Sequence, residues 1–399
     1  MKIQTLSAAY LQSFTCTGSQ CEDTCCFGWG VNIDKRTFAK YKLIKDKKWK
    51  GRLARHIKRS KYETTYSAYA VMKMDEGGYC PFLNQQKLCS IQLELGTSYL
   101  SKTCAGYPRL LNRVMDRFEW SGSLSCPEIA RLALLNPDGI RFMEVESEIE
   151  PNPLLDKLFD DEEWDVIFAE LRPVMIGMVR DRTMPLTNRL LLLGALLEQV
   201  ESHMQAGDVA SAKRVIHGSD TFAHRHRELV ERLPIDAGFQ LQLLQTIIDD
   251  YDAVNAITSK RYLQCLQQFR DGLGTEAPVE RYQEAYRRHM LPFLEEHGYI
   301  LENYLVNNIF SRLFPFAMMG ESVMGDYVVL VLHYALVQMH LTGMAAYHQG
   351  LTADQALVLI QSFARTFEHD VSFFSHSLQR LREIELDHLP GMSLLLRHS

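Results

Sequence analysis

The sequence predicts a mainly α-helical protein, in which a loop-rich cysteine cluster domain is followed by an all-α helical bundle domain. Eight of the nine cysteines lie before residue 127. Beyond residue 165 the apolar residues recur with the 3.6-residue period of a helix, and no register of alternating strands and helices is present. We therefore expect a cysteine-rich metal or iron–sulfur cluster domain (1–135), an acidic linker (136–165) and a helical domain (166–399).

The first domain carries turn signals at 17–19, 75–78 and 121–123, where Gly is combined with Ser, Asp or Glu. Two helices are expected to interrupt the loops. Residues 35–61 are rich in Lys, Arg, Leu and Ala and lack Pro, which favours a helix, and residues 91–103 fit a shorter one that leads to Cys104.

The linker is the most acidic part of the chain. Between Asp138 and Asp165 there are eleven acidic residues against Arg141 and Lys157, and Pro151 and Pro153 interrupt regular structure. We place the domain boundary here.

The second half shows helical periodicity. Apolar residues at 239, 243, 244, 247, 248, 251 and 254 fall on one helical face. Thr352 and Gln355 have the spacing of a capping box, which opens a helix. Cys265 is expected to be a small core residue, and His333 and His340 to lie partly exposed on a helix. Further helices are expected at 166–182, 186–206, 276–297, 301–313, 325–347 and 353–385.

Composition bounds the class of protein. With 399 residues and 46% hydrophobic residues, the chain can bury a core without cross-links, so its cysteines need another explanation. The first residues contain no long apolar stretch, and the densest apolar runs, 190–197 and 328–332, are shorter than the roughly 18 residues of a membrane span. We expect a cytoplasmic protein that does not enter a membrane.

Charge favours a protein partner. Residues 31–61 hold thirteen Lys and Arg against two Asp, the opposite of the acidic linker, and such patches either steer a protein partner or simply solvate two surfaces. No nucleic-acid reader motif accompanies the basic stretch, so nucleic acid is not expected. Helical surfaces would also allow a homo-oligomer, although the sequence does not show how many copies assemble.

The cysteines predict a metal site. Dense thiols in a chain without an export signal indicate a soft metal or an iron–sulfur cluster rather than disulfides. The spacing lacks the Cys-x2-Cys pairs of ferredoxins and zinc ribbons, and the third cysteine of a radical S-adenosylmethionine loop is replaced by Gly28. The candidate ligands therefore come from separate loops: Cys16, Cys21, Cys25, Cys26, Cys80, Cys89, Cys104 and Cys126.

Several occupancies stay open. Eight thiols would allow two four-iron clusters, one cluster with spare thiols, one cluster with an open iron, or a four-thiolate zinc site. Because neighbouring side chains diverge on most backbones, we expect that one of Cys25 and Cys26 is not a ligand.

The cysteine segments carry a resemblance. The runs at 16–29, 80–89, 103–109 and 124–128, which include Cys-Pro-Phe-Leu and Cys-Ala-Gly-Tyr-Pro-Arg, resemble the flagellin lysine N-methyltransferase family (FliB). The cysteine-rich part also resembles the broader zinc- or iron-chelating CxxxCC domain family. The first resemblance implies methyl transfer from S-adenosylmethionine to lysines of flagellin, the protein partner, by an enzyme that holds a [4Fe-4S] cluster.

The implied chemistry needs a proton acceptor and a cofactor site. A lysine amine, with an ordinary pKa of about 10.4, must lose a proton before it attacks a sulfonium methyl group. Near the cysteines we select Tyr107 and Glu128 as catalytic candidates, and Trp29 and Arg109 as cofactor-binding candidates, although each type of side chain is also common as a structural contact. No glycine-rich cofactor loop follows a strand, so an open iron is the expected anchor for S-adenosylmethionine.

A second function stays open. The chain would also suit a non-catalytic zinc or iron–sulfur module that acts as a protein-binding assembly factor. The sequence does not identify the modified lysines or the degree of methylation.

Overall fold

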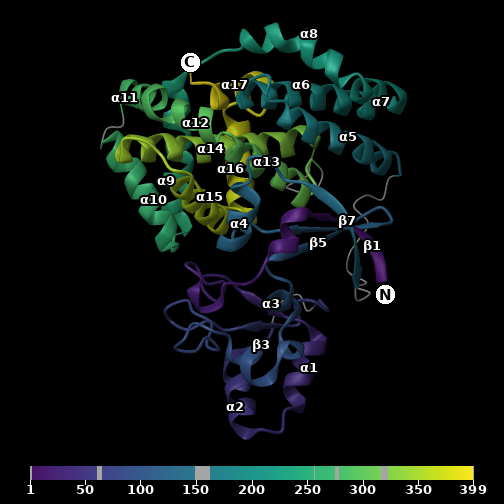
Figure 1. The fold of residues 1–399 in the computed structure, drawn as a ribbon, viewed down its shortest axis with the longest axis vertical. Coiled ribbons are helices and arrows are strands. Elements are labelled where there is room, and N and C mark those ends of the chain that lie inside the picture. The colour runs from purple at the N-terminus through teal and green to yellow at the C-terminus, as the bar shows by residue number, and fades with distance from the viewer. Residues whose placement is uncertain are drawn as a thin grey trace. The chain divides into compact units, whose positions relative to one another are not determined.

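The structure is a computed structural model that describes residues 2–60, 65–148, 162–255, 257–274, 278–315 and 322–398. Helices dominate these residues, which confirms the mainly α fold class (Figure 1). Contacts divide the chain into two compact units. The helical unit comprises Met1–Ser13, Leu111–Ser125 and Ile129–Ser399, and the cysteine-rich unit comprises Phe14–Leu110 and Cys126–Glu128. The domain boundaries drawn from the sequence stay a prediction, and the central part of the expected linker, 149–161, lies outside the described residues.

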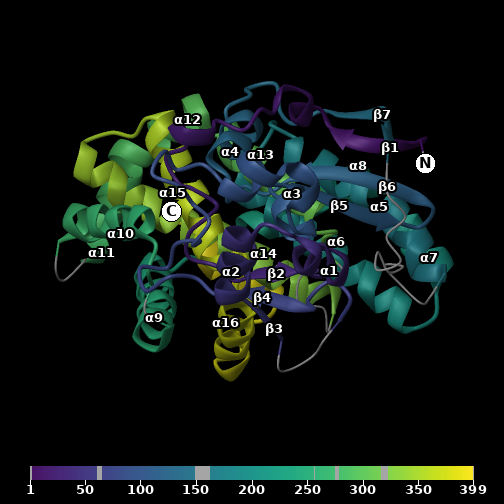
Figure 2. The ribbon, with the colours of Figure 1, turned by 90° about the horizontal axis from the view of Figure 1, so that it is seen from below.

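The cysteine-rich unit packs short helices on a small antiparallel sheet. Its sheet has the order β2-β4-β3, and Figure 2 shows these strands gathered with α1 and α2. The bounds are β2 (Val31–Ile33), β3 (Ile57–Arg59), β4 (Ala70–Met72), α1 (Lys35–Leu43), α2 (Lys47–His56) and α3 (Lys102–Gly106). Buried side chains from all three strands and from α1 and α2 form one core, to which Cys80 belongs.

The single helix expected over 35–61 is two helices and a strand. The carboxylate of Asp46 accepts a hydrogen bond from the Trp49 amide, so Asp46 caps a new helix after an extended residue, Ile44. The helix expected over 91–103 is also divided. Residues Ile91–Leu95 form one π-helical turn, and α3 begins only after Ser101.

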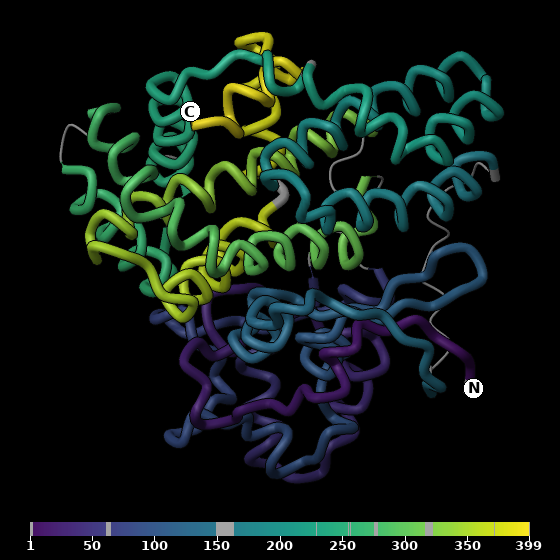
Figure 3. The backbone as a smooth tube through the Cα atoms, turned by 45° about the horizontal axis from the view of Figure 1, so that its top comes forward, coloured from purple at the N-terminus to yellow at the C-terminus, as the bar shows by residue number. Residues whose placement is uncertain are grey.

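The helical unit contains a four-stranded sheet that sequence analysis did not predict. Its order is β5-β6-β1-β7, with β1 parallel to β6 and antiparallel to β7. The bounds are β1 (Lys2–Ala8), β5 (Arg109–Val114), β6 (Arg117–Gly122) and β7 (Phe142–Glu148). Figure 3 shows the purple N-terminal strand alongside β7. Thr5 and Ser7 are among the buried residues of β1, so apolar alternation, the usual signal of a strand, is weak there.

The other elements of this unit are helices. Their bounds are α4 (Pro127–Leu134, whose first two residues belong to the other unit), α5 (Glu162–Arg180), α6 (Leu186–Gln205), α7 (Val209–His217), α8 (Ser219–Glu231), α9 (Ala237–Asn255), α10 (Lys260–Leu273), α11 (Val279–Ala285), α12 (Leu291–His297), α13 (Tyr299–Ser311), α14 (Val323–His348), α15 (Ala353–Phe367), α16 (Val371–Glu383) and α17 (Leu389–Leu396). The capping box at Thr352 and Gln355 is present. The helix expected over 353–385 is two helices, because Asp370 caps α16.

Helix α14 is the core of the helical unit. Its length and composition would allow it to cross a membrane, but its apolar window is entirely buried inside the protein, as in the core helix of a soluble protein. The expected partial exposure of His333 and His340 is therefore wrong, since both are fully buried on this helix. Cys265 is buried in α10, which confirms its expected place in the core.

Candidate metal centre

Five cysteines of the cysteine-rich unit line one small cavity of about 90 Å³. They come from three separate segments of the chain: Cys25, Cys26, Cys80, Cys89 and Cys104. The cavity lies at the edge of the unit's apolar core, against side chains of β2 and β4. The expected convergence of thiols from distant loops is present for these five.

Backbone pairing brings the first two segments together. The amide of Cys80 donates to the carbonyl of Cys26 at 2.8 Å, and the amide of Gly28 donates to the carbonyl of Gly78 at 3.0 Å. Both glycines have a positive φ, +77° and +82°, which other residues rarely adopt. These turns hold the Cys25-Cys26 loop against the Cys80 segment.

Local caps position the other two thiols. An isolated bridge between Leu83 and Cys89 closes the loop that follows Cys80. The hydroxyl of Ser101 accepts from the Cys104 amide at 3.1 Å. The carboxylate of Asp34 accepts from the amide of Lys102 at 3.0 Å, so the residue that caps α1 also anchors α3.

The thiols interact with one another. A hydrogen bond with Cys25 lowers the pKa of Cys26, but the hydrogen bond with Cys80 and burial outweigh it and raise that pKa to about 12. The same hydrogen bond lowers the pKa of Cys80 below its ordinary value. Burial raises the pKa of Cys104 to about 11.

The donor set suits a soft metal or an iron–sulfur cluster. All nine cysteines lie in the described part of the chain, and none of them forms a disulfide. The cavity wall contains five thiols and the thioether of Met72, but no carboxylate or imidazole. As the side chains stand, no three Cys, His, Asp or Glu residues within the described ranges are close enough to hold a metal ion. The chemistry of the residues therefore fits, whereas a closed coordination shell is not formed.

The remaining three predicted ligands do not line this cavity. Cys16 is exposed, and Cys21 and Cys126 are half-buried. Both Cys25 and Cys26 do line it, although we expected that one of this pair would not be a ligand.

Of the four other candidate residues, two line the cavity and two do not. Trp29 and Tyr107 lie on the cavity wall, with ring centroids 5.6 Å apart, and the Trp29 indole donates to the carbonyl of Cys25. Arg109 does not line the cavity, and its guanidinium lies 4.9 Å from the ring centroid of Phe14. Glu128 is half-buried in the first turn of α4, also away from the cavity wall.

Sequence reasoning missed eight of the residues that line the cavity, with Met72 and Tyr41 among them. The thioether of Met72 accepts from the thiol of Cys80 at 3.2 Å, and Tyr41 donates its hydroxyl to the carbonyl of Tyr99. Met72 lies in a short strand and Tyr41 on a helix. At such positions the sequence pattern does not distinguish the apolar core from a cavity wall.

Comparisons with known proteins connect this fold to a family. The profile described as the FliB lysine N-methylase C-terminal domain matches residues 172–395. The lysine-N-methylases of Salmonella choleraesuis and Salmonella typhimurium are each 23% identical over 395 residues, which covers 92% of this chain and 93% of theirs. The flagellar biosynthetic protein FliU of Salmonella muenchen is 33% identical over 147 residues, 37% of this chain and 86% of that protein. No solved structure matches. The family profile covers more than half of the chain, and the chain belongs to the FliB lysine N-methylase family.

Proposed function

We propose that this protein is a cytoplasmic enzyme that transfers methyl groups from S-adenosylmethionine to lysine side chains of flagellin, and that it depends on an iron–sulfur cluster held by the cavity thiols. The single observation that carries the cluster is the convergence on one cavity of five cysteines, none of which forms a disulfide.

The comparisons support the reaction class and the substrate. The relatives that span almost the whole chain are lysine-N-methylases, and a third relative is a flagellar biosynthetic protein. A lysine methylase among flagellar proteins has flagellin as a natural substrate, in agreement with the sequence resemblance.

The residues that would hold a four-iron cluster are three or four of the five cavity cysteines. When bound through three of them, such a cluster would supply an open iron that stays in one redox state and can bind the amino and carboxylate groups of the cofactor's methionine part. Cys16, Cys21 and Cys126 are not needed for this set.

The aromatic wall suits the acceptor lysine. Trp29 and Tyr107 present apolar rings beside the thiols, and an apolar surrounding favours the neutral amine that attacks a methyl group. The reaction forms a bond between the lysine nitrogen and the methyl carbon while the bond between that carbon and sulfur breaks, and the nitrogen loses a proton. Phenol and lysine have similar ordinary pKa values, about 10 and about 10.4, so Tyr107 is suited to relay this proton.

The cavity volume favours a second candidate function. About 90 Å³ has no room for a cofactor beside a cluster unless the wall opens, whereas a single zinc ion needs less space and would require only that four thiol side chains turn toward one another. The protein would then be a non-catalytic zinc module that binds a flagellar partner.

Anaerobic purification tests the two candidates. Brown protein with acid-labile sulfide supports the cluster, whereas colourless protein with one zinc per chain supports the module. Incubation with labelled S-adenosylmethionine and flagellin should then add methyl mass to flagellin lysines. If brown, cluster-loaded protein leaves flagellin unlabelled, the proposed reaction is wrong.

A further inference from the structure

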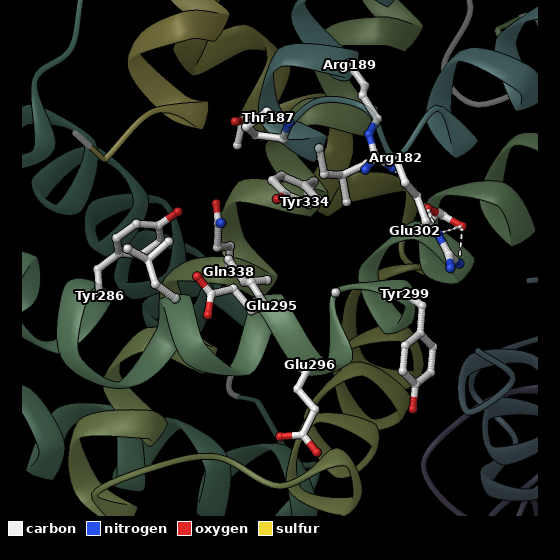
Figure 4. A pocket seen from close by; sticks show the side chains of 15 residues that line it. Arg182, Thr187, Arg189, Tyr286, Glu295, Glu296, Tyr299, Glu302, Tyr334 and Gln338 are labelled. Atoms are coloured by element: carbon white, nitrogen blue, oxygen red, sulfur yellow. Dashed lines mark hydrogen bonds and ion pairs between the residues drawn. The ribbon is translucent and has the colours of Figure 1, made fainter. Parts of the chain in front are cut away.

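A second cavity, of about 380 Å³, lies within the helical unit, and no cysteine is among the described residues that line it. It is enclosed by the start of α6, the π-helical turn Tyr286–Met290, α12, the start of α13 and α14 (Figure 4). Its volume is in the range of small-molecule sites. The whole cavity belongs to the part of the chain that the family profile matches.

One wall offers hydrogen-bond donors. Gln338 is 1% exposed; its amide oxygen bonds His398 Nε2 at 2.8 Å, and its amide nitrogen has no partner among the described residues. Tyr286 and Tyr334 line the same cavity, and Figure 4 shows both hydroxyls on the side of the Gln338 amide. Burial raises the pKa of Tyr286 to about 12 and raises that of Tyr334 further, so both hydroxyls stay protonated donors. A buried amide without a partner is costly, and a ligand oxygen would satisfy it.

The adjoining wall holds two guanidinium groups. Glu302 accepts from Arg182 Nη2 at 2.8 Å and from Arg189 Nη1 at 3.0 Å, and all three residues line the cavity. One carboxylate faces two guanidinium groups in the cavity wall, and Asp181 and Asp138, which do not line the cavity, also act on these guanidinium groups. The charge of Arg189 also acts on the Tyr334 hydroxyl, which places the two groups near each other. This wall and the donors suit a carboxylate.

The mouth has the opposite charge. Glu295 and Glu296 line the cavity and are exposed, while Leu186, Leu291 and Leu294 supply apolar wall. Glu296 lies 3.6 Å from the ring of its neighbour His297, and Glu295 has no ion pair within the described ranges. A cation beside the bound carboxylate would be favoured here.

We propose that this cavity binds the α-amino-acid group of a small molecule, with its carboxylate on Gln338, Tyr334 and Tyr286 and its ammonium toward Glu295. The remaining volume takes the rest of the ligand along the leucines. The ligand is either a free amino acid or a larger molecule that carries this group, such as the thioether product of methyl transfer. The site requires no metal and goes beyond the proposed methyl transfer.

Isothermal titration calorimetry of the full chain tests the site with four probes: L-methionine, L-lysine, S-adenosylhomocysteine and L-methioninamide, which lacks the carboxylate. At least one of the first three should bind, and the amide should bind at least tenfold more weakly than L-methionine or not at all. Binding of S-adenosylhomocysteine alone identifies the larger class of ligand, and binding of L-methionine or L-lysine identifies a free amino acid.

Variants connect the binding to the cavity. Tyr334→Phe and Tyr286→Phe remove one donor each and should weaken the bound probe about tenfold. Tyr282→Phe makes the same substitution at a buried tyrosine that does not line the cavity, and should leave the affinity unchanged. The proposal is overturned if none of the probes binds, or if L-methioninamide binds as tightly as L-methionine. It is also overturned if Tyr334→Phe and Tyr286→Phe both keep full affinity for the bound probe. These measurements use cluster-free protein, so their outcome is separate from that of the methyl-transfer assay.

Discussion

The charge of Glu302 should be a main support of the helical unit. Its side chain is 4% exposed and faces Arg189, which is 9% exposed, and Arg182, which is 50% exposed. Glu302→Gln removes the carboxylate that is paired with the buried guanidinium of Arg189 and leaves only the charge of Asp181 acting on it; breaking a buried pair in this way costs about 3–5 kcal/mol. Arg182 can turn into solvent, so Arg182→Gln should cost less than about 1 kcal/mol. We expect a loss near the lower limit for Glu302→Gln, about 3 kcal/mol.

Urea unfolding followed by helical circular dichroism measures these differences. The double variant Glu302→Gln/Arg189→Leu also removes the guanidinium that Glu302→Gln leaves unpaired. Its loss of unfolding free energy should therefore be smaller, by at least about 1 kcal/mol, than the sum of the losses of Glu302→Gln alone and Arg189→Leu alone. If Glu302→Gln and Arg182→Gln destabilise equally, the buried pair does not act as described. The same conclusion follows if the losses of Glu302→Gln and Arg189→Leu simply add in the double variant.

Two further predictions concern the core of the helical unit. A Cβ at Gly343 would lie 2.4 Å from Cδ2 of Phe269, so Gly343→Ala should destabilise by about 1–3 kcal/mol, while Gly177→Ala, in an exposed helical position with open space, should stabilise by about 0.5–1 kcal/mol. Thermal melts that show the same sign for both would refute the packing argument. Burial lowers the pKa of His333 to about 3 and of His340 to about 4. Between the lowered values and about pH 6.5, only the unfolded chain binds these protons. The free energy of unfolding should therefore be full above about pH 6.5 and fall as the pH drops toward 4, by about 1.4 kcal/mol per pH unit for each histidine. His333→Leu should flatten that fall in unfolding measured from pH 7 to pH 4, and an unchanged slope would contradict the assignment.

Local sequence signals predicted the helices well where one face is apolar. The pattern from residue 239 to 254 lies within α9, and Thr352 opens α15 as expected. Predicted helices were too long where an aspartate begins a new helix, at Asp46 and at Asp370, because a cap inside a helix-favouring stretch changes the periodicity little. Strand β1 was missed since its buried face includes Thr5 and Ser7, which carry no apolar signal.

The sequence predicted the chemistry of the candidate site, but it did not predict which cysteines line the cavity. Cysteine density indicated a thiol site, but the spacing could not separate Cys80 and Cys104, which line the cavity, from Cys16 and Cys126, which do not. That distinction depends on pairing between residues far apart in the chain, such as the bond from Cys80 to Cys26. The cavity of the helical unit left no motif at all, because the residues that line it come from elements far apart in the sequence.

Iron and sulfide content of multiple cysteine variants tests the central claim most directly. Cys26→Ser/Cys80→Ser/Cys104→Ser leaves two thiols at the cavity, fewer than the three that even a four-iron cluster with one open iron requires, whereas Cys16→Ser/Cys21→Ser leaves all five. After anaerobic purification, the first variant should lose iron, sulfide and methyl transfer to flagellin, and the second should keep all three. A first variant that retains its iron, or a second variant that loses it, would contradict the assignment of the cluster to this cavity.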